Sequence, residues 1–484
     1  MQLLQRLFET FHNAGRELYL VGGAVRDLAM GASWESLDDL DFATNALPRE
    51  SLELLQKAGY RTYDVGIEFG TVGTIIRGPA SEGYPKDVQV TTYRSKEKYR
   101  RGSRHPVVSF GDSIDEDLCR RDFSINSIAM DAKGDYYDPY DGRGDINRRT
   151  LRAVGDPLER LAEDPLRILR IARFMAKLGF EPDAQLEHAA YAKATYLLEI
   201  ARQRWLQEMN KLVCGPHAAM ALEFLARTRA LGVILPELVA LVGLERRCPA
   251  GPSHPDFWAQ TLKRVERAGK DRNLSWAALL ADVGRPWTRT LEPMSEDVPG
   301  PILSGLSQEA YPQEPAQGAV TSFPHHQLMA GLMFKGIARR FHFDNPTSDH
   351  VSFVLSHQRA AIGYDAHSWG DAEVRHFVRD MNGEHEAVIA FGKLLGPEEP
   401  KAANADLDGL AARIKALGES GQLVPELPKG LGGQFIQQLG LKPGPVLGEL
   451  IEQIKQDMLD GRLGFGLDVE DYIAHARTLC LGRP

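Results

Sequence analysis

A pair of glycines near the start of the chain has the position and conformational freedom needed to hold a phosphate. Gly22 and Gly23 lie between an apolar run at 18–21, typical of a strand, and a helix-like run at 25–30. At a strand-to-helix turn, glycine lets the backbone approach a ligand closely, and free N–H groups at the helix N-terminus favour an anion. The pattern predicts a phosphate-binding turn, although a glycine pair taken alone is more often an ordinary turn.

Two aspartates follow at a spacing suited to metal binding. Asp39 and Asp41 alternate around Leu40 in a predicted second strand, which directs both carboxylates to the same face. Carboxylate oxygens are preferred ligands of Mg²⁺, and a pair of Mg²⁺ ions can clamp a triphosphate and activate an attacking hydroxyl. Beside a phosphate-binding turn, this spacing predicts a site for phosphoryl transfer.

These two stretches, VGGAVRDLAMG at 21–31 and DDLDFATNALP at 38–48, resemble the head of the class II tRNA nucleotidyltransferases. These CCA-adding enzymes share their catalytic domain with bacterial poly(A) polymerases. The resemblance implies template-independent addition of C, C and A to the 3′ end of tRNA from CTP and ATP, with Mg²⁺ as cofactor and pyrophosphate as a product. The residues that it assigns to catalysis and metal binding are Asp39 and Asp41, and those that it assigns to the nucleotide are Gly22, Gly23 and Arg26.

A second motif, RRDFSIN at 120–126, matches the family pattern that contacts the incoming nucleotide. The residues alone leave open another interpretation, an arginine pair ahead of a buried strand. The resemblance gives Arg121 to the triphosphate and Asp122 to the ribose hydroxyls, a contact that would favour NTP over dNTP.

The segment EDPLRILRIARF at 163–174 carries the most specific indication of the substrate. Asp164 and the proline after it are predicted to open a helix, with Arg167 one turn further along. Cytosine and adenine both present an amine donor beside a ring-nitrogen acceptor, whereas guanine and uracil present the reverse. An aspartate acceptor and an arginine donor match only the first pair. The family uses these two residues as a protein template, with the arginines equivalent to Arg170 and Arg173 supporting the triphosphate and the site.

The organisation of the chain changes at about residue 155. Before it, short apolar strands alternate with turns, and after it the apolar spacing is helical to the C-terminus. We predict an α/β N-terminal nucleotidyltransferase head with a mixed sheet and helices, followed by an all-α neck, body and tail. The predicted domains are the catalytic head at 1–155, the neck with its nucleotide-selecting helix at 156–235, the HD-like body at 236–395 with a Pro-, Gly- and Ser-rich mobile insertion at 287–322, and a tRNA-binding tail at 396–484.

Composition excludes several classes of protein. A chain of 484 residues is too long to fold around a single hydrophobic core, so several domains are expected. No segment approaches the ~20 apolar residues of a membrane span. The four isolated cysteines form no disulfide or metal framework, so we expect a cytoplasmic protein that does not bind membranes. The net charge is −9, yet basic residues concentrate at 94–104 and 148–173, and such faces can hold a phosphate backbone.

One departure from the family pattern concerns a third active-site carboxylate. Where many relatives carry it, this chain has Gln89, and Asp87 on the same strand face is the alternative ligand. The two aspartates of the Asp-x-Asp pair are therefore the expected metal ligands.

A further resemblance, to an HD-type phosphohydrolase domain, covers residues 276–286 but lacks key ligands. Ala281 stands where a metal-binding histidine belongs, and Gln260 stands where another is expected. Loss of two imidazole ligands removes most affinity for a transition metal, so we predict a helical scaffold without hydrolase activity. The ligand positions that remain are Asp282, His326 and His357.

Several alternatives stay open on the sequence alone. A partial enzyme that adds only CC or only A is the nearest, although the interval from Thr92 to Asp117 has the full length expected of the loop that terminal A addition requires. A poly(A) polymerase is disfavoured because residues 64–71 continue in the CCA-type pattern. A phosphohydrolase and a non-catalytic RNA-binding protein are disfavoured by the missing histidines and by the intact Asp-x-Asp pair, respectively.

Overall fold

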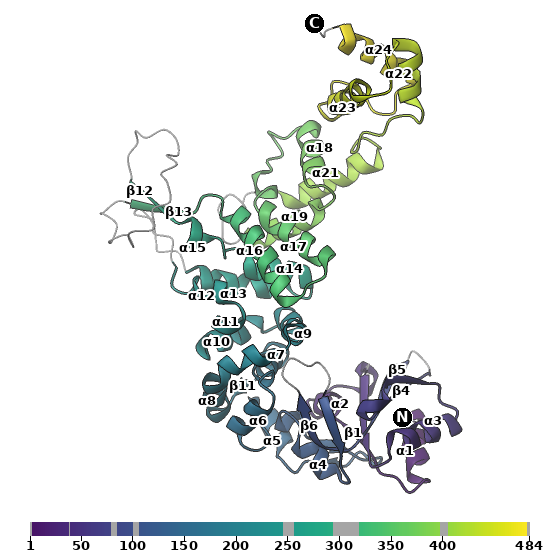
Figure 1. Cartoon of the computed structure of the whole chain (residues 1–484), viewed down its shortest axis with the longest axis vertical. Coiled ribbons are helices and arrows are strands. Elements are labelled where there is room, and N and C mark those ends of the chain that lie inside the picture. Colours follow the sequence, from purple (N-terminus) through teal and green to yellow (C-terminus); the bar gives the residue numbers. More distant parts are fainter. Residues whose placement is uncertain are drawn as a thin grey trace. The chain divides into compact units, whose positions relative to one another are not determined.

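The computed structural model describes residues 2–37, 39–78, 85–99, 106–244, 256–293, 319–396 and 405–481. The chain divides into two compact units. The first contains residues 1–239 and 340–342, and the second contains 240–339 and 343–484. Figure 1 labels the elements of both.

A seven-stranded mixed sheet forms the head of the first unit, as predicted, with the strand order β3-β4-β5-β2-β1-β8-β9. The two strands that carry the motifs are neighbours at its centre: β1 pairs antiparallel with β2, and β2 pairs parallel with β5. The strands are β1 (Leu18–Val21), β2 (Asp39–Thr44), β3 (Thr62–Gly66), β4 (Thr71–Ile76), β5 (Lys86–Thr92), β8 (Ala129–Met130) and β9 (Tyr136–Tyr137), and the separate ribbon is β6 (Arg94–Tyr99) with β7 (Pro106–Phe110).

Short helices complete the head. The residues after the RRD motif form a 3-10 turn, η4 (Ser124–Asn126), so the buried strand considered for this segment is restricted to β8. Residues 100–105, in the predicted flexible loop, lie outside the described residues. The helices are α1 (Gln2–His12), α2 (Gly23–Ala29), α3 (Pro48–Lys57), α4 (Ile114–Cys119) and α5 (Gly142–Arg148), with the 3-10 turns η1 (Trp34–Ser36) and η2 (Ile67–Phe69).

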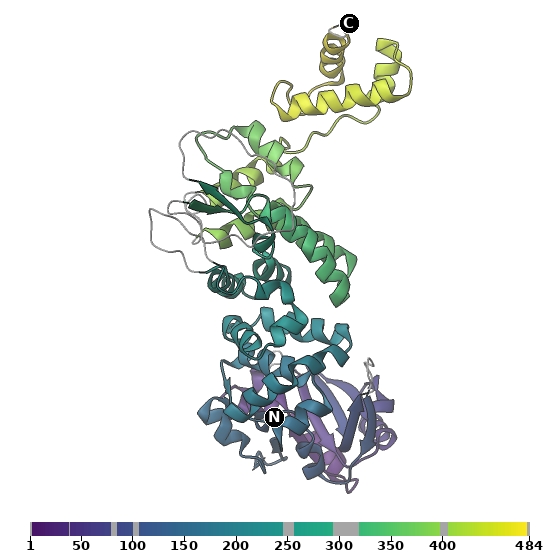
Figure 2. The ribbon, with the colours of Figure 1, turned by 60° about the vertical axis from the view of Figure 1, so that its left-hand side comes forward.

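Helices dominate the rest of the first unit, and Figure 2 shows them in teal beside the purple and blue strands. A short parallel pair, β10 (Thr150–Leu151) with β11 (Glu181–Pro182), interrupts the predicted all-α neck. Phe123 of the head packs edge-to-face on Phe174 of the neck, with 5.5 Å between ring centroids. The helices are α6 (Pro157–Glu163), α7 (Arg167–Leu178), α8 (Ala184–Lys193), η5 (Ala194–Glu199), α9 (Arg202–Val213), α10 (Ala218–Arg227), α11 (Ala230–Ile234) and α12 (Pro236–Val239).

The second unit is also mainly helical. The predicted insertion at 287–322 is more ordered at its ends than expected, because β12 (Thr290–Pro293) and β13 (Ala319–Ser322) pair as an antiparallel ribbon. Residues 294–318 of that insertion lie outside the described residues. The helices are α13 (Phe257–Ala268), α14 (Arg272–Leu280), α15 (Arg285–Thr288), α16 (His326–Phe341), α17 (Asn345–His357), η6 (Ala361–Gly363), α18 (Asp371–Asp380), α19 (His385–Leu395), α21 (Leu407–Glu419), α22 (Leu431–Leu439), α23 (Pro445–Leu459) and α24 (Val469–Leu481).

A buried lysine at the start of β5 holds the turn that precedes β2. The side chain of Lys86 is 1% exposed, and its ammonium donates to the carbonyl oxygens of Trp34 (2.9 Å) and Leu37 (2.5 Å). These carbonyls belong to the turn that leads into the Asp-x-Asp strand. The lysine is therefore the side-chain donor to the buried carbonyl of Leu37, and it adds a second donor to the carbonyl of Trp34, which also accepts the N–H of Leu37 at 3.3 Å.

We predict that Lys86→Met lowers the free energy of unfolding by about 1–3 kcal/mol, because the buried carbonyl of Leu37 loses this donor while the carbonyl of Trp34 retains the N–H of Leu37. Urea denaturation followed by circular dichroism measures the change. The matched control is Lys57→Met, whose exposed ammonium pairs with the exposed Glu53 at 3.7 Å, so its effect should stay below about 0.5 kcal/mol. Equal stability of Lys86→Met and the unmodified protein would contradict this account.

Candidate active site

All residues predicted to bind nucleotide or metal line one cavity of about 1050 Å³ in the first unit. The head contributes the glycine turn, the Asp-x-Asp strand and the RRD motif, and the neck contributes α7 and the turn before it. The residues that the structure brings together are Gly22, Gly23, Arg26, Asp39, Asp41, Arg121, Asp122, Asp164, Arg167, Arg170 and Arg173.

The glycine turn lies directly against the catalytic groups. Gly22 has φ 72° and ψ −132°, a conformation that is open to glycine but strained for residues with a Cβ atom. A Cβ atom at this position would lie 3.2 Å from Nη1 of Arg121 and 3.8 Å from Oδ2 of Asp41. The register explains this proximity, because Val21, the residue before the turn, pairs with Asp41.

The two aspartates fit a divalent metal. Asp39 and Asp41 are exposed on β2 while Leu40 between them is buried, so their carboxylates share one face as predicted. Partial burial raises the pKa of Asp41; Arg121 opposes this rise, and Asp39 and Asp87 add to it. A cation bound between the carboxylates would relieve the same repulsion.

β5, the parallel neighbour of β2, carries the position where a third active-site carboxylate was expected. Asp41 pairs with Gln89 and Asp39 pairs with Asp87. Gln89 lines the cavity, whereas Asp87 is absent from the cavity lining found in the described residues and accepts a hydrogen bond from Tyr63. The amide oxygen of Gln89 is thus the neutral ligand available at the position where the family pattern leads us to expect a third carboxylate.

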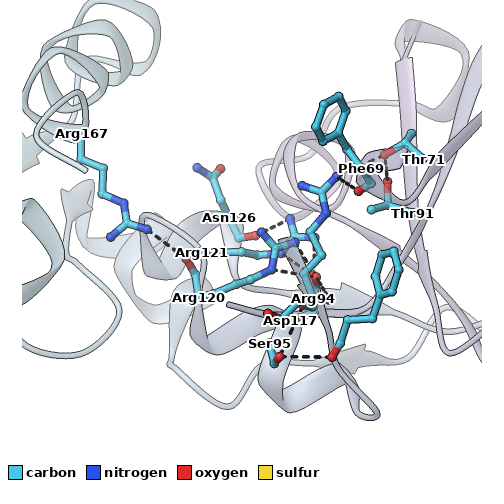
Figure 3. A network of polar contacts seen from close by, with 12 residues as sticks. Phe69, Thr71, Thr91, Arg94, Ser95, Asp117, Arg120, Arg121, Asn126 and Arg167 are labelled. Atoms are coloured by element: carbon cyan, nitrogen blue, oxygen red, sulfur yellow. Dashed lines mark hydrogen bonds and ion pairs between the residues drawn. The ribbon is translucent and has the colours of Figure 1, made fainter. Parts of the chain in front are cut away.

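A buried carboxylate that the sequence did not single out holds the arginine pair of the RRD motif. The side chain of Asp117 is 1% exposed and accepts from Arg120 (2.5 Å) and Arg121 (2.8 Å), while Arg94 donates its backbone N–H at 3.3 Å. Figure 3 shows these groups converging. Burial by itself would raise the pKa of Asp117, but the two guanidiniums outweigh it and lower the pKa to about 2. The spacing of three and four residues was the available signal in the sequence.

The carboxylate of Asp122 is fully engaged by protein donors. Its Oδ1 accepts from the N–H of Phe123 (2.9 Å) and from the amide of Asn126 (3.0 Å), and its Oδ2 accepts from two nitrogens of Arg170. These contacts use all four acceptor positions of a carboxylate. Burial opposes ionisation, but Arg170 keeps the pKa of Asp122 well below its usual range. Binding of ribose hydroxyls by Asp122 stays a prediction, and it requires the Arg170 contact to rearrange.

Other predicted phosphate-binding arginines also have protein partners. Arg26 is almost fully buried and donates to Asp27 (2.7 Å) and to Asn126 (2.8 Å). Arg173 pairs with the buried Glu208 at 3.1 Å. The cavity is therefore walled by guanidiniums that are fixed in place.

The prediction that Asp164 begins the same helix as Arg167 was wrong. α6 ends at Glu163, Asp164 has φ −141° and ψ 96°, and α7 begins at Arg167. The cause is Pro165, because the residue before a proline is driven to extended conformations. Asp164 still caps the turn: its Oδ1 accepts the N–H of Leu166 at 3.2 Å.

Arg167 is anchored by backbone carbonyls. Its Nη1 donates to the carbonyl of Arg160 (2.9 Å) and contacts Glu163 (3.3 Å), and its Nη2 donates to the carbonyl of Arg120 at 3.1 Å. The last contact is also drawn in Figure 3. The guanidinium of the neck thereby reaches the RRD loop of the head.

The predicted HD-like site in the second unit is filled by arginines. Both carboxylate oxygens of Asp282 accept from guanidiniums, one from Arg264 at 2.7 Å and the other from Arg285. The ring of His326 donates to the carbonyl of Phe323, and burial together with Arg285 lowers the pKa of this histidine to about 4. The third remaining position, His357, donates to the carbonyl of Phe353 at 2.9 Å.

Both oxygens of Asp282 are therefore engaged by guanidiniums at the position where the HD-like pattern expects a metal. In the part of the chain that the structure describes, no group of three or more His, Cys, Asp or Glu residues could hold a metal ion. The loss of hydrolase activity stays a prediction.

Comparison with known proteins places these observations in a family. Residues 18–152 match the family described as the Poly A polymerase head domain, and residues 179–241 match the probable RNA and SrmB-binding site of polymerase A. A CCA-adding enzyme of Geobacillus kaustophilus is 38% identical over 307 residues, which is 62% of this chain and 69% of the relative. The chain belongs to the CCA-adding enzyme family.

The family resemblance extends beyond the head. The CCA-adding enzyme of Streptococcus thermophilus is 26% identical over 468 residues, covering 94% of this chain and 92% of the relative. The crystal structure of the Bacillus stearothermophilus CCA-adding enzyme in complex with CTP superposes with a TM-score of 0.64 at 24% identity, covering 100% of this chain and 99% of that one. At this identity the superposition shows the fold alone. None of the described helices is both long and apolar enough to cross a membrane.

We predict that Gly22→Ala lowers nucleotide addition at least about 100-fold, because the new methyl group displaces Arg121 from the catalytic carboxylates. Single-turnover extension of tRNA measures the loss. Backbone strain of about 1–3 kcal/mol is expected in addition, and Gly59→Ala controls for it. Gly59 also has a positive φ, 84°, but a Cβ atom added there would meet no other atom within 4 Å. Equal activities of the two variants would show that strain alone is responsible.

Proposed function

We propose that this protein adds C, C and A to the 3′ end of tRNA from CTP and ATP, without a nucleic-acid template and with release of pyrophosphate. The observation that carries the proposal is the shared cavity. It joins the Asp39–Asp41 pair, suited to nucleotidyl transfer, to the Asp164–Arg167 pair, suited to selecting a base. Because tRNA, CTP and ATP meet in the cytoplasm, we propose that the protein acts there.

The metal-binding role falls to the aspartates of β2. Proteins of this nucleotidyltransferase family depend on a divalent metal, and we propose Mg²⁺ with Asp39 and Asp41 as its ligands, since both donors are hard oxygens on one face. When bound, the ions supply charge stabilisation at the transferred phosphoryl group and lower the pKa of the primer 3′-hydroxyl.

The chain's own cations hold the triphosphate in this proposal. Arg121 lies against the glycine turn and is held by Asp117 at 2.8 Å, so the protein itself fixes its position. Arg26, Arg170 and Arg173 line the same cavity. Fixed cations lose little entropy when a phosphate binds, which favours transition-state stabilisation.

In this proposal, base selection depends on the N–H groups of Arg167 that its protein contacts leave available and on the carboxylate of Asp164. A guanidinium has five N–H groups, and Arg167 uses three of them on Arg160, Glu163 and Arg120. Within the described residues, two N–H groups therefore remain for the acceptors of a base edge. Cytosine offers N3 and O2, and adenine offers N1. The exocyclic amine of either base would donate to Asp164.

The neck offers a surface for the RNA. Tyr191 and Tyr196 are about two-fifths exposed, and each ring has a cation 4.7 Å from its centroid, Arg229 and Lys193 respectively. Exposed aromatic rings with adjacent cations suit stacking against unpaired bases. In the predicted tRNA-binding tail at 396–484, by contrast, acidic residues outnumber basic ones, so we place part of the tRNA contact on the neck.

Extension assays with single nucleotides test the proposal. We predict that the protein extends tRNA ending at the discriminator base with CTP, and tRNA-C-C with ATP. Extension by CTP only or by ATP only would instead indicate a partial enzyme, and long A tails on unrelated RNA would indicate a poly(A) polymerase.

We predict that Asp39→Ala and Asp41→Ala each lower the rate of nucleotide addition at least about a thousandfold, because several kcal/mol of charge stabilisation disappear. Near-native activity with an unchanged circular dichroism spectrum would remove these carboxylates from the mechanism.

Substitution of the template pair should change base choice. We predict that Asp164→Asn and Arg167→Ala reduce discrimination against UTP and GTP by about one to two powers of ten, since each buried unsatisfied group costs about 1–3 kcal/mol. Arg121→Ala should instead weaken all four nucleotides alike. The measurement is kcat/KM for each NTP on tRNA-C and tRNA-C-C. An unchanged ratio in the template variants would make these residues structural.

A further inference from the structure

An exposed tyrosine lies on the face of the head sheet that carries the Asp-x-Asp pair. Tyr63 of β3 is 38% exposed, and it is absent from the cavity lining found in the described residues. It pairs with Gly73 of β4, which pairs with Gln89 of β5. Gln89 in turn pairs with Asp41 of β2. Paired residues of neighbouring strands project to the same face, so Tyr63 lies in one cross-strand row with a catalytic aspartate.

The ring of Tyr63 is held across the neighbouring strand. β4 lies between β3 and β5, and the hydroxyl of Tyr63 donates to Oδ1 of Asp87 on β5. The side chain therefore spans β4, where its row is occupied by Gly73, which has no side chain to obstruct it. Gly73 is buried although this face of β5 and β2 is partly open. The tyrosine ring thus has one side against the sheet and its other side accessible.

A second exposed apolar side chain extends this surface. Ile75 of β4 is exposed and pairs with Asp87, which pairs with Asp39. The opposite face of these strands carries their buried side chains and packs against α3. Tyr63 and Ile75 are therefore exposed on the catalytic side of the sheet. Exposed apolar side chains gathered beside a catalytic pair indicate a surface that binds a partner.

The distance from the catalytic pair fits a base of the RNA primer. β4 is two strands from β2, and neighbouring strands are about 4.8 Å apart, so a ring over β4 lies roughly 10 Å from the aspartates. Stacked nucleotides rise about 3.4 Å each, so this span corresponds to about two to three nucleotide steps. In tRNA-C-C, the discriminator base is two steps before the nucleotide that carries the 3′-hydroxyl. The incoming nucleotide is assigned to the cavity with Asp164 and Arg167, which leaves the open sheet face for the RNA.

We propose that Tyr63 is a primer-positioning residue, whose ring stacks with the discriminator base while the 3′-hydroxyl lies beside Asp39 and Asp41. The inference rests on the proposed function and deepens it, because it assigns a binding position to the unpaired end of the RNA. Stacking on an aromatic ring tolerates every base, so the contact positions the primer without selecting its sequence. Asp87 fixes the ring through the hydroxyl and thereby serves the site without lining the cavity.

The test measures stacking directly. The fluorescence of 2-aminopurine falls when it stacks on an aromatic ring, so this base analogue is placed at the discriminator position of tRNA-C-C. Binding to the unmodified protein in the absence of nucleotide should quench the fluorescence, and Tyr63→Leu should abolish most of the quenching. In steady-state extension with ATP, Tyr63→Leu should raise the KM for tRNA-C-C about tenfold through the loss of one base stack, with kcat and the KM for ATP unchanged within about twofold.

Two further variants separate the ring from its surroundings. Tyr63→Phe retains the ring without the hydrogen bond to Asp87, so it should keep the quenching. The matched control is Tyr137→Leu, because Tyr137 is 39% exposed and donates to Asp115 at 2.6 Å but belongs to β9, at the other end of the sheet. This control should change neither the quenching nor the KM for tRNA-C-C.

A second measurement keeps the test decisive if circular dichroism shows that Tyr63→Leu does not fold. The unmodified protein is then photocrosslinked to tRNA-C-C that carries 5-iodouridine at the discriminator position. Mass spectrometry of the crosslinked peptide should place the bond on Tyr63.

The outcomes distinguish the inference from the proposed function. Quenching that is unchanged in Tyr63→Leu, an equal loss of quenching in Tyr137→Leu, or a crosslink to another residue would overturn the inference. A fall in kcat with an unchanged KM for tRNA-C-C would show that Tyr63 is only structural and would overturn it as well. Failure of the unmodified protein to extend tRNA, with quenching that still depends on Tyr63, would instead overturn the proposed function. Loss of quenching together with a higher KM for tRNA-C-C, both absent in Tyr137→Leu, supports the assignment.

Discussion

Mutual repulsion among arginines is the constraint on which this site depends. The cavity gathers guanidiniums from the head and the neck before any phosphate is present, and like charges at such spacing would force the walls apart without anions between them. The structure supplies a carboxylate for each cluster. Asp117 holds Arg120 and Arg121, Asp122 holds Arg170, Glu208 holds Arg173, and Asp164 holds Arg204.

These ion pairs explain why the long, flexible arginine side chains hold fixed positions along the cavity. Removing one partner of a buried pair leaves an uncompensated charge and typically costs about 3–5 kcal/mol, so each arginine is confined to the position of its carboxylate. Several of these pairs also join different elements. Asp122 belongs to the head and Arg170 to the neck, and Arg167 of the neck donates to the carbonyl of Arg120. The groups that bind phosphate and the groups that read the base are therefore parts of one hydrogen-bonded assembly.

The same chemistry stabilises the second unit for another purpose. Asp282 stands at a position that the HD-like pattern gives to a metal ligand, and Arg264 and Arg285 bind its two oxygens. A guanidinium needs no coordination by histidines, so Gln260 and Ala281 at the expected imidazole positions are compatible with this arrangement. The neutral His326 beside Arg285 fits this cationic surrounding, as the low pKa of its ring indicates. Asp282 is thus part of a buried ion-pair cluster.

The sequence by itself determined the local parts of this protein. Alternation around Leu40 predicted that Asp39 and Asp41 share a face, the glycine pair predicted the turn before α2, and apolar spacing predicted a mixed sheet followed by helices. These features depend on residues within a few positions of one another, and local periodicity records them. The break between Asp164 and α7 is local too, because it follows from Pro165. Only the tertiary structure decided that Arg204, 40 residues away, contacts Asp164 and that Arg170 contacts Asp122. Such pairs depend on how helices pack, and a single sequence carries no local pattern for a contact between distant elements.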